Sequence, residues 1–77
     1  MDDSAVSKII SQRFPKEAEG VVESTRIGNS SVIAGYILSG NVYSPVGDLI
    51  GFVDGHHAFA RYGLVNVHLG KTFYRGR

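Results

Sequence analysis

Apolar residues near the start of the chain recur with the spacing of an α-helix. Val6, Ile9, Ile10 and Phe14 fall at i, i+3, i+4 and i+8, and so form one stripe. Asp3 or Ser4 can cap the start, because either side chain accepts a bond from a free backbone N–H. Pro15 ends the helix, since a residue before proline avoids the α conformation. Such a short helix needs support, so we expect its stripe to dock on the sheet or on a second subunit.

From Gly20 onward the pattern changes to short β-type segments separated by turn residues. The segment from Leu64 to Leu69 alternates between apolar and polar residues, with Val65, Val67 and Leu69 on one side. This predicts one buried and one solvent-exposed face. The chain therefore predicts a mainly β fold, a short N-terminal helix followed by a closed or nearly closed meander of seven or eight short strands. The expected strands are Val21–Ile27, Val32–Leu38, Val42–Ser44, Leu49–Val53, His57–Arg61, Leu64–Leu69 and Thr72–Tyr74, with turns that include Gly28-Asn29-Ser30 and Gly70-Lys71.

A repeat of about 15 residues underlies these strands, because Gly40, Gly55 and Gly70 are evenly spaced and follow similar apolar runs. Asp54-Gly55 is the sharpest signal, since a type I′ hairpin turn needs residues that tolerate positive φ. Repeats this short cannot bury their own apolar faces and must pack on one another. We expect glycines where the strands converge, because only glycine lets two backbones approach closely.

The repeat resembles the four-fold β-flower domain, a small bacterial domain built from strand–turn–strand units. Ile50–Gly63 (IGFVDGHHAFARYG) carries nearly all of its pattern, and Ala34–Gly47 (AGYILSGNVYSPVG) carries it with one insertion and one deletion. A third copy, Val65–Gly76, has Asn66 in place of its first glycine. The resemblance covers about residues 34–76. It implies a fold and supplies no reaction.

Composition places few constraints on function. We expect residues 1–19 to form a helix and connector, and residues 20–77 a β domain. Eight Lys or Arg against seven Asp or Glu give a net charge of +1, which favours neither nucleic acid nor an anionic membrane as a partner. There is no cysteine, no apolar run long enough for a membrane span, and no signal-peptide pattern. We therefore expect a soluble cytoplasmic protein, and a small domain without disulfides often oligomerises.

Three histidines are the candidate metal ligands: His56, His57 and His68. Neighbouring strand residues point to opposite faces, so His56 and His57 do not easily share one ion. His68 and one of the pair could lie on adjacent strands, and two histidines with a carboxylate would suit zinc. The structural alternative is that all three are half-exposed strand residues and that Asp54 is a turn residue.

Aromatic residues interleave with basic ones along the second half of the chain. One reading is an aromatic-lined ligand pocket, and another is a surface that stacks single-stranded nucleic acid. The alternative is that the aromatics are core and cross-strand pairs beside solvated charges. The ligand-binding candidates are Tyr36, Tyr43, Phe59 and Tyr74, and the nucleic-acid candidates are Arg61, Lys71, Arg75 and Arg77.

No residue pattern marks a catalytic group or a cofactor site, so an enzyme is the least supported class. The leading hypothesis is a small interaction module that acts as a homo-oligomer, a dimer or larger, with the helix at the interface. The first alternative is a binder of a small apolar molecule in a pocket at a subunit junction. The second is a small-barrel nucleic-acid binder, to which the charge balance lends no support.

Overall fold

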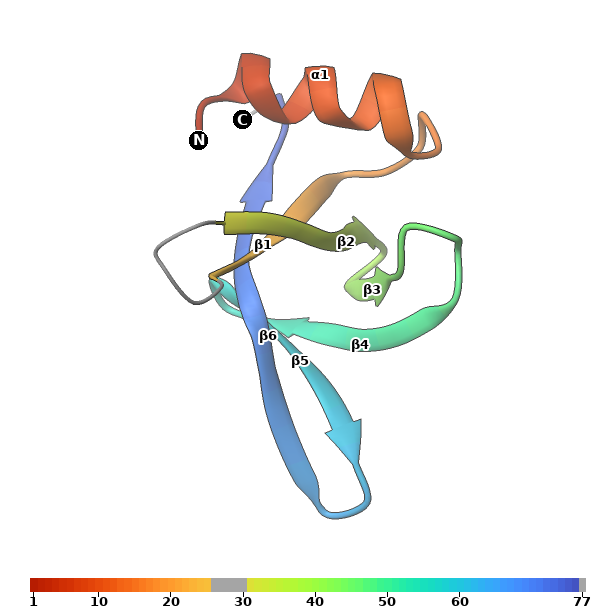
Figure 1. Cartoon of the computed structure of the whole chain (residues 1–77), viewed down its shortest axis with the longest axis vertical. Helices are drawn as coiled ribbons and strands as arrows, with labels where there is room; N and C mark the ends of the chain where they lie inside the picture. The colour runs from red at the N-terminus through yellow and green to blue at the C-terminus, as the bar shows by residue number, and fades with distance from the viewer. Residues whose placement is uncertain (26–30, 77) are drawn as a thin grey trace.

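The computed structural model describes residues 1–25 and 31–76. It shows one helix followed by six antiparallel strands that close into a small barrel, each strand pairing with its neighbour in sequence and the last with the first (Figure 1). The mainly β prediction with an N-terminal helix is confirmed. The elements are α1 Asp3–Arg13, β1 Gly20–Thr25, β2 Ser31–Leu38, β3 Asn41–Tyr43, β4 Leu49–Asp54, β5 His57–Tyr62 and β6 Val65–Tyr74.

Helix α1 begins one residue earlier than the sequence suggested. The Asp2 carboxylate accepts a hydrogen bond of 2.8 Å from the Ala5 N–H, so Asp2 is the cap in place of Asp3 or Ser4. Asp3 in the first turn and Arg13 in the last have the charges that the helix dipole favours. Phe14, directly before Pro15, is already extended, as predicted.

The described residues form six strands, fewer than the seven or eight expected. The two predicted strands Leu64–Leu69 and Thr72–Tyr74 are one continuous strand, β6, and Gly70 lies inside it. The predicted Gly70-Lys71 turn is therefore wrong, because β6 continues past β5 to pair with β1. The predicted turn Gly28-Asn29-Ser30 lies outside the described residues.

The barrel interior is filled by small and branched apolar side chains. Val22, Ile37, Val42 and Ala58 are fully buried there. The side chains packed around them, half-buried and from strands β2, β4 and β6, are Ala34, Ile50, Val53, Leu69 and Tyr74. Pairing of Gly20 to Glu23 with Lys71 to Tyr74 closes the barrel around this core.

A second apolar layer lies between α1 and the outer face of the barrel. Val6, Ile10 and Phe14 pack with Ala18, Val21 and Tyr36 in one buried cluster. Strands β1 and β2 are therefore covered on both faces, which agrees with the unbroken apolar pairs Val21-Val22 and Tyr36-Ile37. The helix stripe therefore docks on the sheet of its own chain, one of the two partners expected for it. The expectation that the helix forms a subunit interface stays a prediction.

Four glycines lie where backbones pass closest, as expected from the sequence. At each one an added Cβ would collide with the carbonyl oxygen of a neighbouring strand. These glycines allow short, strongly bent strands to close into so small a barrel. They are Gly20, Gly35, Gly51 and Gly70.

Thr72 brings an unsatisfied hydroxyl into the barrel wall. It pairs with Val22, it is buried, and its Oγ1 has no hydrogen-bond partner within the described part of the chain. Leaving a buried hydroxyl unpaired costs about 1–3 kcal/mol. We expect Thr72→Val to stabilise the protein by about 1 kcal/mol and to raise the melting temperature by about 4–8 °C. Calorimetry would check this, and a lower melting temperature would show that the hydroxyl is hydrogen-bonded in solution.

Candidate functional site

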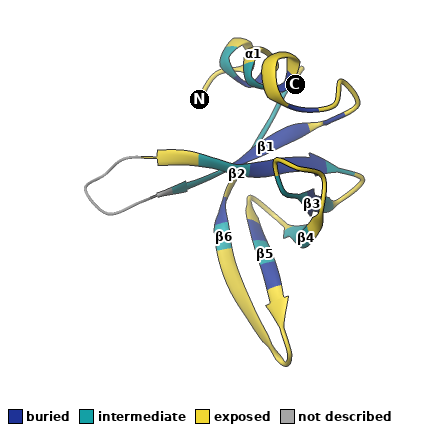
Figure 2. Ribbon diagram, turned by 45° about the vertical axis from the view of Figure 1, so that its right-hand side comes forward, coloured by how far each residue is buried: buried dark blue, intermediate teal, exposed yellow. Residues whose placement is uncertain are grey.

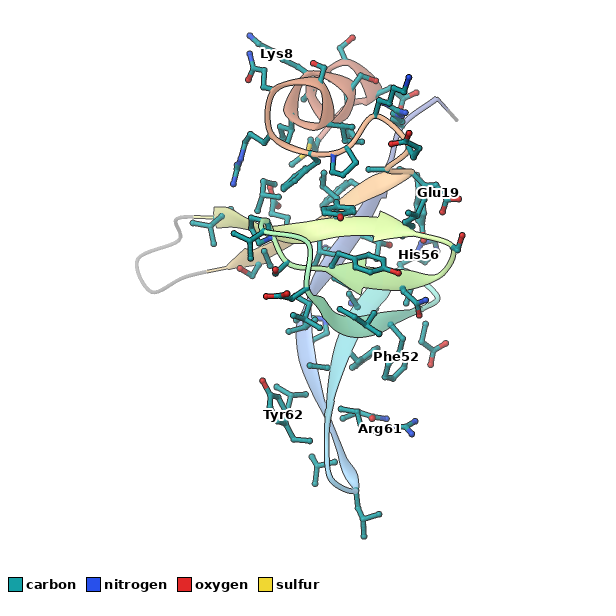
Figure 3. The ribbon with its side chains drawn as sticks, turned by 90° about the vertical axis from the view of Figure 1, so that its right-hand side faces the viewer. Lys8, Glu19, Phe52, His56, Arg61 and Tyr62 are labelled. Carbon is teal, nitrogen blue, oxygen red and sulfur yellow. The ribbon has the colours of Figure 1, made fainter. Side chains whose placement is uncertain are left out.

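The β5–β6 hairpin projects beyond the barrel and has two different faces (Figure 1). Directly opposed residues of paired strands point to the same side of a sheet. Phe59 opposes His68 and Arg61 opposes Asn66 on one face, which we call the histidine face. Figure 3 shows Phe52 and Arg61 on one side of the hairpin and Tyr62 on the other.

The other side of the hairpin is the apolar hairpin face, made by Tyr62, Val65 and Val67 with Leu64 at the tip. It continues the face of β5 whose Ala58 and Ala60 are buried. Beyond the barrel nothing in the described chain covers it, so Tyr62 is 67% exposed, Val65 62% and Val67 42%, and Leu64 is fully exposed. Figure 2 shows this change from buried to exposed along β5 and β6. Exposed apolar side chains gathered in one patch are typical of an interaction surface.

This patch corrects the sequence analysis, which assigned Val65, Val67 and Leu69 to a buried face. Only Leu69 packs against the barrel core. Val65 and Val67 alternate as a buried strand would, but their part of β6 extends past β1, which pairs with β6 only from Lys71 to Tyr74. The alternation showed which side is apolar and could not show that the strand leaves the barrel.

On the histidine face, two imidazole rings meet across the strands. His57 Nδ1 lies 3.0 Å from His68 Nε2, and the ring centroids are 5.0 Å apart. A β-bulge at Ala58/Phe59 makes this possible, because it shifts the register by one residue and turns His68 to the side of His57. Both rings are exposed to solvent.

Aromatic rings on the same face of the sheet contact the pair. Phe59 contacts His68 edge-on at a centroid distance of 5.5 Å, and Phe52 stacks on Phe59 at 5.9 Å. The Arg61 guanidinium lies 5.8 Å from the centre of the Phe52 ring. Such contacts hold ring orientations at modest energy, so the histidine face is an ordered ladder of side chains.

A pocket of about 280 Å³ opens beside the two histidines. Lys71 lies in register between Glu23 on β1 and His57 on β5, and all three line the pocket with His68. The pocket thus combines two imidazoles with one positive and one negative side chain. Within residues 1–25 and 31–76, no group of three or more His, Cys, Asp or Glu side chains is placed to hold a metal ion.

His56 does not join the pair. It lies in the turn between β4 and β5, it is exposed, and its backbone carbonyl accepts a bond of 3.0 Å from the Thr72 N–H. Figure 3 shows it away from Phe52 and Arg61. Of the three histidines singled out by sequence, the structure therefore brings together His57 and His68 alone.

The four ligand-binding candidates do not line one pocket. Tyr36 and Tyr43 stack at 5.4 Å beneath the helix, where Phe14 covers Tyr36. Phe59 lies on the histidine face, and Tyr74 packs against the barrel interior. The structural alternative, core and cross-strand pairs, describes them better.

The basic candidates are likewise spread over the molecule. Arg61 and Lys71 belong to the hairpin, whereas Arg75 lies near the helix, where its side chain donates to the Lys16 carbonyl and its N–H to Glu19. Arg77 lies outside the described residues. Glu23, Lys71, His57 and Asp54 lie side by side in one row across the sheet, with an acidic residue at each end. The hairpin therefore lacks the uniform positive surface that phosphates favour.

Comparison of the chain with protein-family models, with curated proteins and with solved structures finds no match. The resemblance to the four-fold β-flower domain therefore stays a prediction. No helix in the described part of the chain has the length and apolar character needed to cross a membrane.

Sequence reasoning missed Phe52, Glu23 and the whole apolar hairpin face. Phe52 lies on β4, directly before the strand that carries His57, and it reaches the histidine face because β4 pairs with β5. Glu23 on β1 is distant in sequence, and only barrel closure brings it beside Lys71. A sequence signal for the apolar face was present, since the expected strand Leu64–Leu69 begins with the apolar pair Leu64-Val65 directly after Gly63. Apolar residues at a turn tip are an exception to the usual polar composition of loops.

Proposed function

We propose that this chain is a small interaction module that acts as a homo-oligomer through its β5–β6 hairpin. The observation that carries the proposal is the apolar hairpin face, which extends the core surface into solvent. Fully burying an exposed Val or Leu side chain contributes roughly 1.5–3 kcal/mol, and each of these four side chains would contribute in proportion to the area that it still exposes. A domain of this size has a small core, so burying these side chains would enlarge its buried apolar surface by a large fraction.

A second copy is the partner that fits this surface best. Besides its apolar side chains, β6 offers a backbone edge, because no described strand pairs with its outer side between Val65 and His68. Two such edges can pair antiparallel about a two-fold axis, and each then supplies hydrogen-bond partners for the unpaired backbone groups of the other. The same surface is then used twice, and both apolar hairpin faces lie on one side of the joined sheet.

Charge supports self-association as well. The segment from Tyr62 to Val67 (YGLVNV) contains no charged residue, so two copies brought together there meet no like charges. A partner recognised by opposite charge would leave a different pattern, with charged groups around the patch. The near-neutral chain adds no long-range repulsion between copies.

The proposal predicts that Val65→Lys/Val67→Lys converts the protein to a monomer without unfolding it. Lysines on an edge strand block pairing, and both positions are exposed in the single chain. Light scattering coupled to size exclusion, at micromolar concentration, should show an oligomer for the wild type and a monomer for the variant. Circular dichroism should show the same β content for both.

Val46→Lys/Leu49→Lys is the matched control, because these two apolar residues are also exposed but lie before and at the start of β4, away from the hairpin tip. It should remain an oligomer. A wild type that stays monomeric as its concentration is raised would contradict the proposal. So would a control that dissociates as fully as the hairpin variant.

A further inference from the structure

We propose that His57 and His68 form a binding site for a divalent late first-row transition metal, Zn²⁺, Ni²⁺ or Cu²⁺. This inference is independent of the proposed function, since it concerns the histidine face and not the apolar hairpin face. It rests on the convergence of one nitrogen from each ring at 3.0 Å, at the edge of a pocket open to solvent.

The distance between the two nitrogens is close to that of a metal-bound pair. Zn²⁺ binds imidazole nitrogen at about 2.0–2.1 Å, so two nitrogens at a tetrahedral angle lie about 3.3 Å apart. A small rotation of either exposed ring opens 3.0 Å to that value. Imidazole is also the donor that these metals prefer, whereas Mg²⁺ and Ca²⁺ prefer oxygen.

Metal binding requires one particular tautomer of each ring. His57 must carry its proton on Nε2 and His68 on Nδ1, so that both facing nitrogens present lone pairs. Without metal, the same two nitrogens can share one proton in a hydrogen bond. A metal ion therefore competes with a single hydrogen bond, which is worth only about 0.5–1.5 kcal/mol net and does not prevent binding.

The backbone holds the two ligands on one face before any ion arrives. The bulge at Ala58/Phe59 sets their register, and the edge-on contact with Phe59 positions the His68 ring. Ligands carried by paired strands keep their spacing better than ligands on loops, and a preformed site loses less entropy on binding.

The site is open, and its other coordination positions are left to water or to a donor from a bound molecule. No third His, Cys, Asp or Glu of the described chain is placed as a ligand. Glu23 and Lys71 line the same pocket. The ammonium of Lys71 opposes a cation, so we expect exchangeable binding weaker than that of a closed structural zinc site.

Calorimetric titration of the full chain with Zn²⁺ tests the proposal. We expect saturation at one ion per chain and no binding of Mg²⁺. His57→Gln and His68→Gln should each lower the affinity by more than about tenfold, since the loss of a second-shell partner alone costs that much. His56→Gln is the matched control and should bind like the wild type, because His56 stands apart from the pair.

Proton NMR of the wild type gives a second readout that needs no variant. Zn²⁺ should shift the ring resonances of two histidines and leave those of the third in place. The proposal is overturned if Zn²⁺ does not saturate a single site, if His56→Gln weakens binding as much as the other two variants, or if all three histidines shift together.

Discussion

Gly51→Ala should destabilise the barrel by at least about 3 kcal/mol, the upper range for overpacked sites. An added Cβ at Gly51 would overlap the carbonyl oxygen of Phe59 on the adjacent strand. The backbone must move to relieve this clash, because the obstructing atom is a backbone oxygen and not the flexible end of a side chain. Gly51 also pairs with the fully buried Val42, so the movement would disturb the core. Urea denaturation followed by circular dichroism would measure the loss.

Gly63→Ala is the control for the general effect of replacing a glycine. Gly63 lies in the hairpin turn with φ +61°, and an added Cβ there meets no atom within 4 Å. Only the backbone conformation opposes the change, at about 1–2 kcal/mol. Equal losses for the two variants would mean that the close approach at Gly51 does not exist in solution.

Ile10→Ala should cost about 2–5 kcal/mol, the range for truncating a fully buried aliphatic side chain. Ile10 is completely buried between α1 and the outer face of the barrel. The chain is small, so a loss of this size removes much of its stability. The loss should be the same at every protein concentration, because the helix docks on its own barrel.

Ile9→Ala is the matched control on the same helix. Ile9 is only half-buried at the edge of the same cluster, so its truncation should cost clearly less. Two equal, small losses would indicate that the helix is detached in solution. A loss that grows on dilution would instead indicate that the helix stripe is shared between subunits.

Local patterns in the sequence predicted the parts of the fold that depend on local interactions. The stripe of Val6, Ile10 and Phe14 and the break at Pro15 located α1 to within a residue or two. The Asp54-Gly55 pair correctly located the β4–β5 hairpin, but the predicted turn residues are shifted by one: Asp54 ends β4 and pairs with His57, and the turn is Gly55-His56, with Gly55 at φ +64°. Each of these features depends on a few adjacent residues whose conformational preferences are strong.

The histidine pair shows why the candidate site could be foreseen only in outline. The sequence suggested that His68 and one residue of the His56-His57 pair lie on adjacent strands. Continued without a bulge, the register that pairs His57 with Lys71 would place His68 on the opposite face. The extra residue, Leu69, packs into the core. The position of the bulge depends on which side chain fits the space inside the closed barrel, and no local sequence pattern shows this.

Gly70 gives the same lesson for the strand count. By its place in the repeat it resembled the turn glycines Gly40 and Gly55. In the fold it lies where β6 passes the Glu23 carbonyl of β1. A glycine in a turn and a glycine inside a strand at a close approach look alike in sequence, because both simply lack a side chain.

Barrel closure by β1 and β6 has a consequence for folding during synthesis on the ribosome. The other strand pairs join consecutive strands, but Gly20–Glu23 must wait for Lys71–Tyr74. Contacts between such distant segments form slowly, since the chain between them loses conformational entropy before the new contacts contribute any stability. Until those last residues emerge from the exit tunnel, β1 keeps an unpaired edge and Glu23 and Lys71 remain apart. The nascent chain is then most exposed to chaperones and to misfolding with its neighbours.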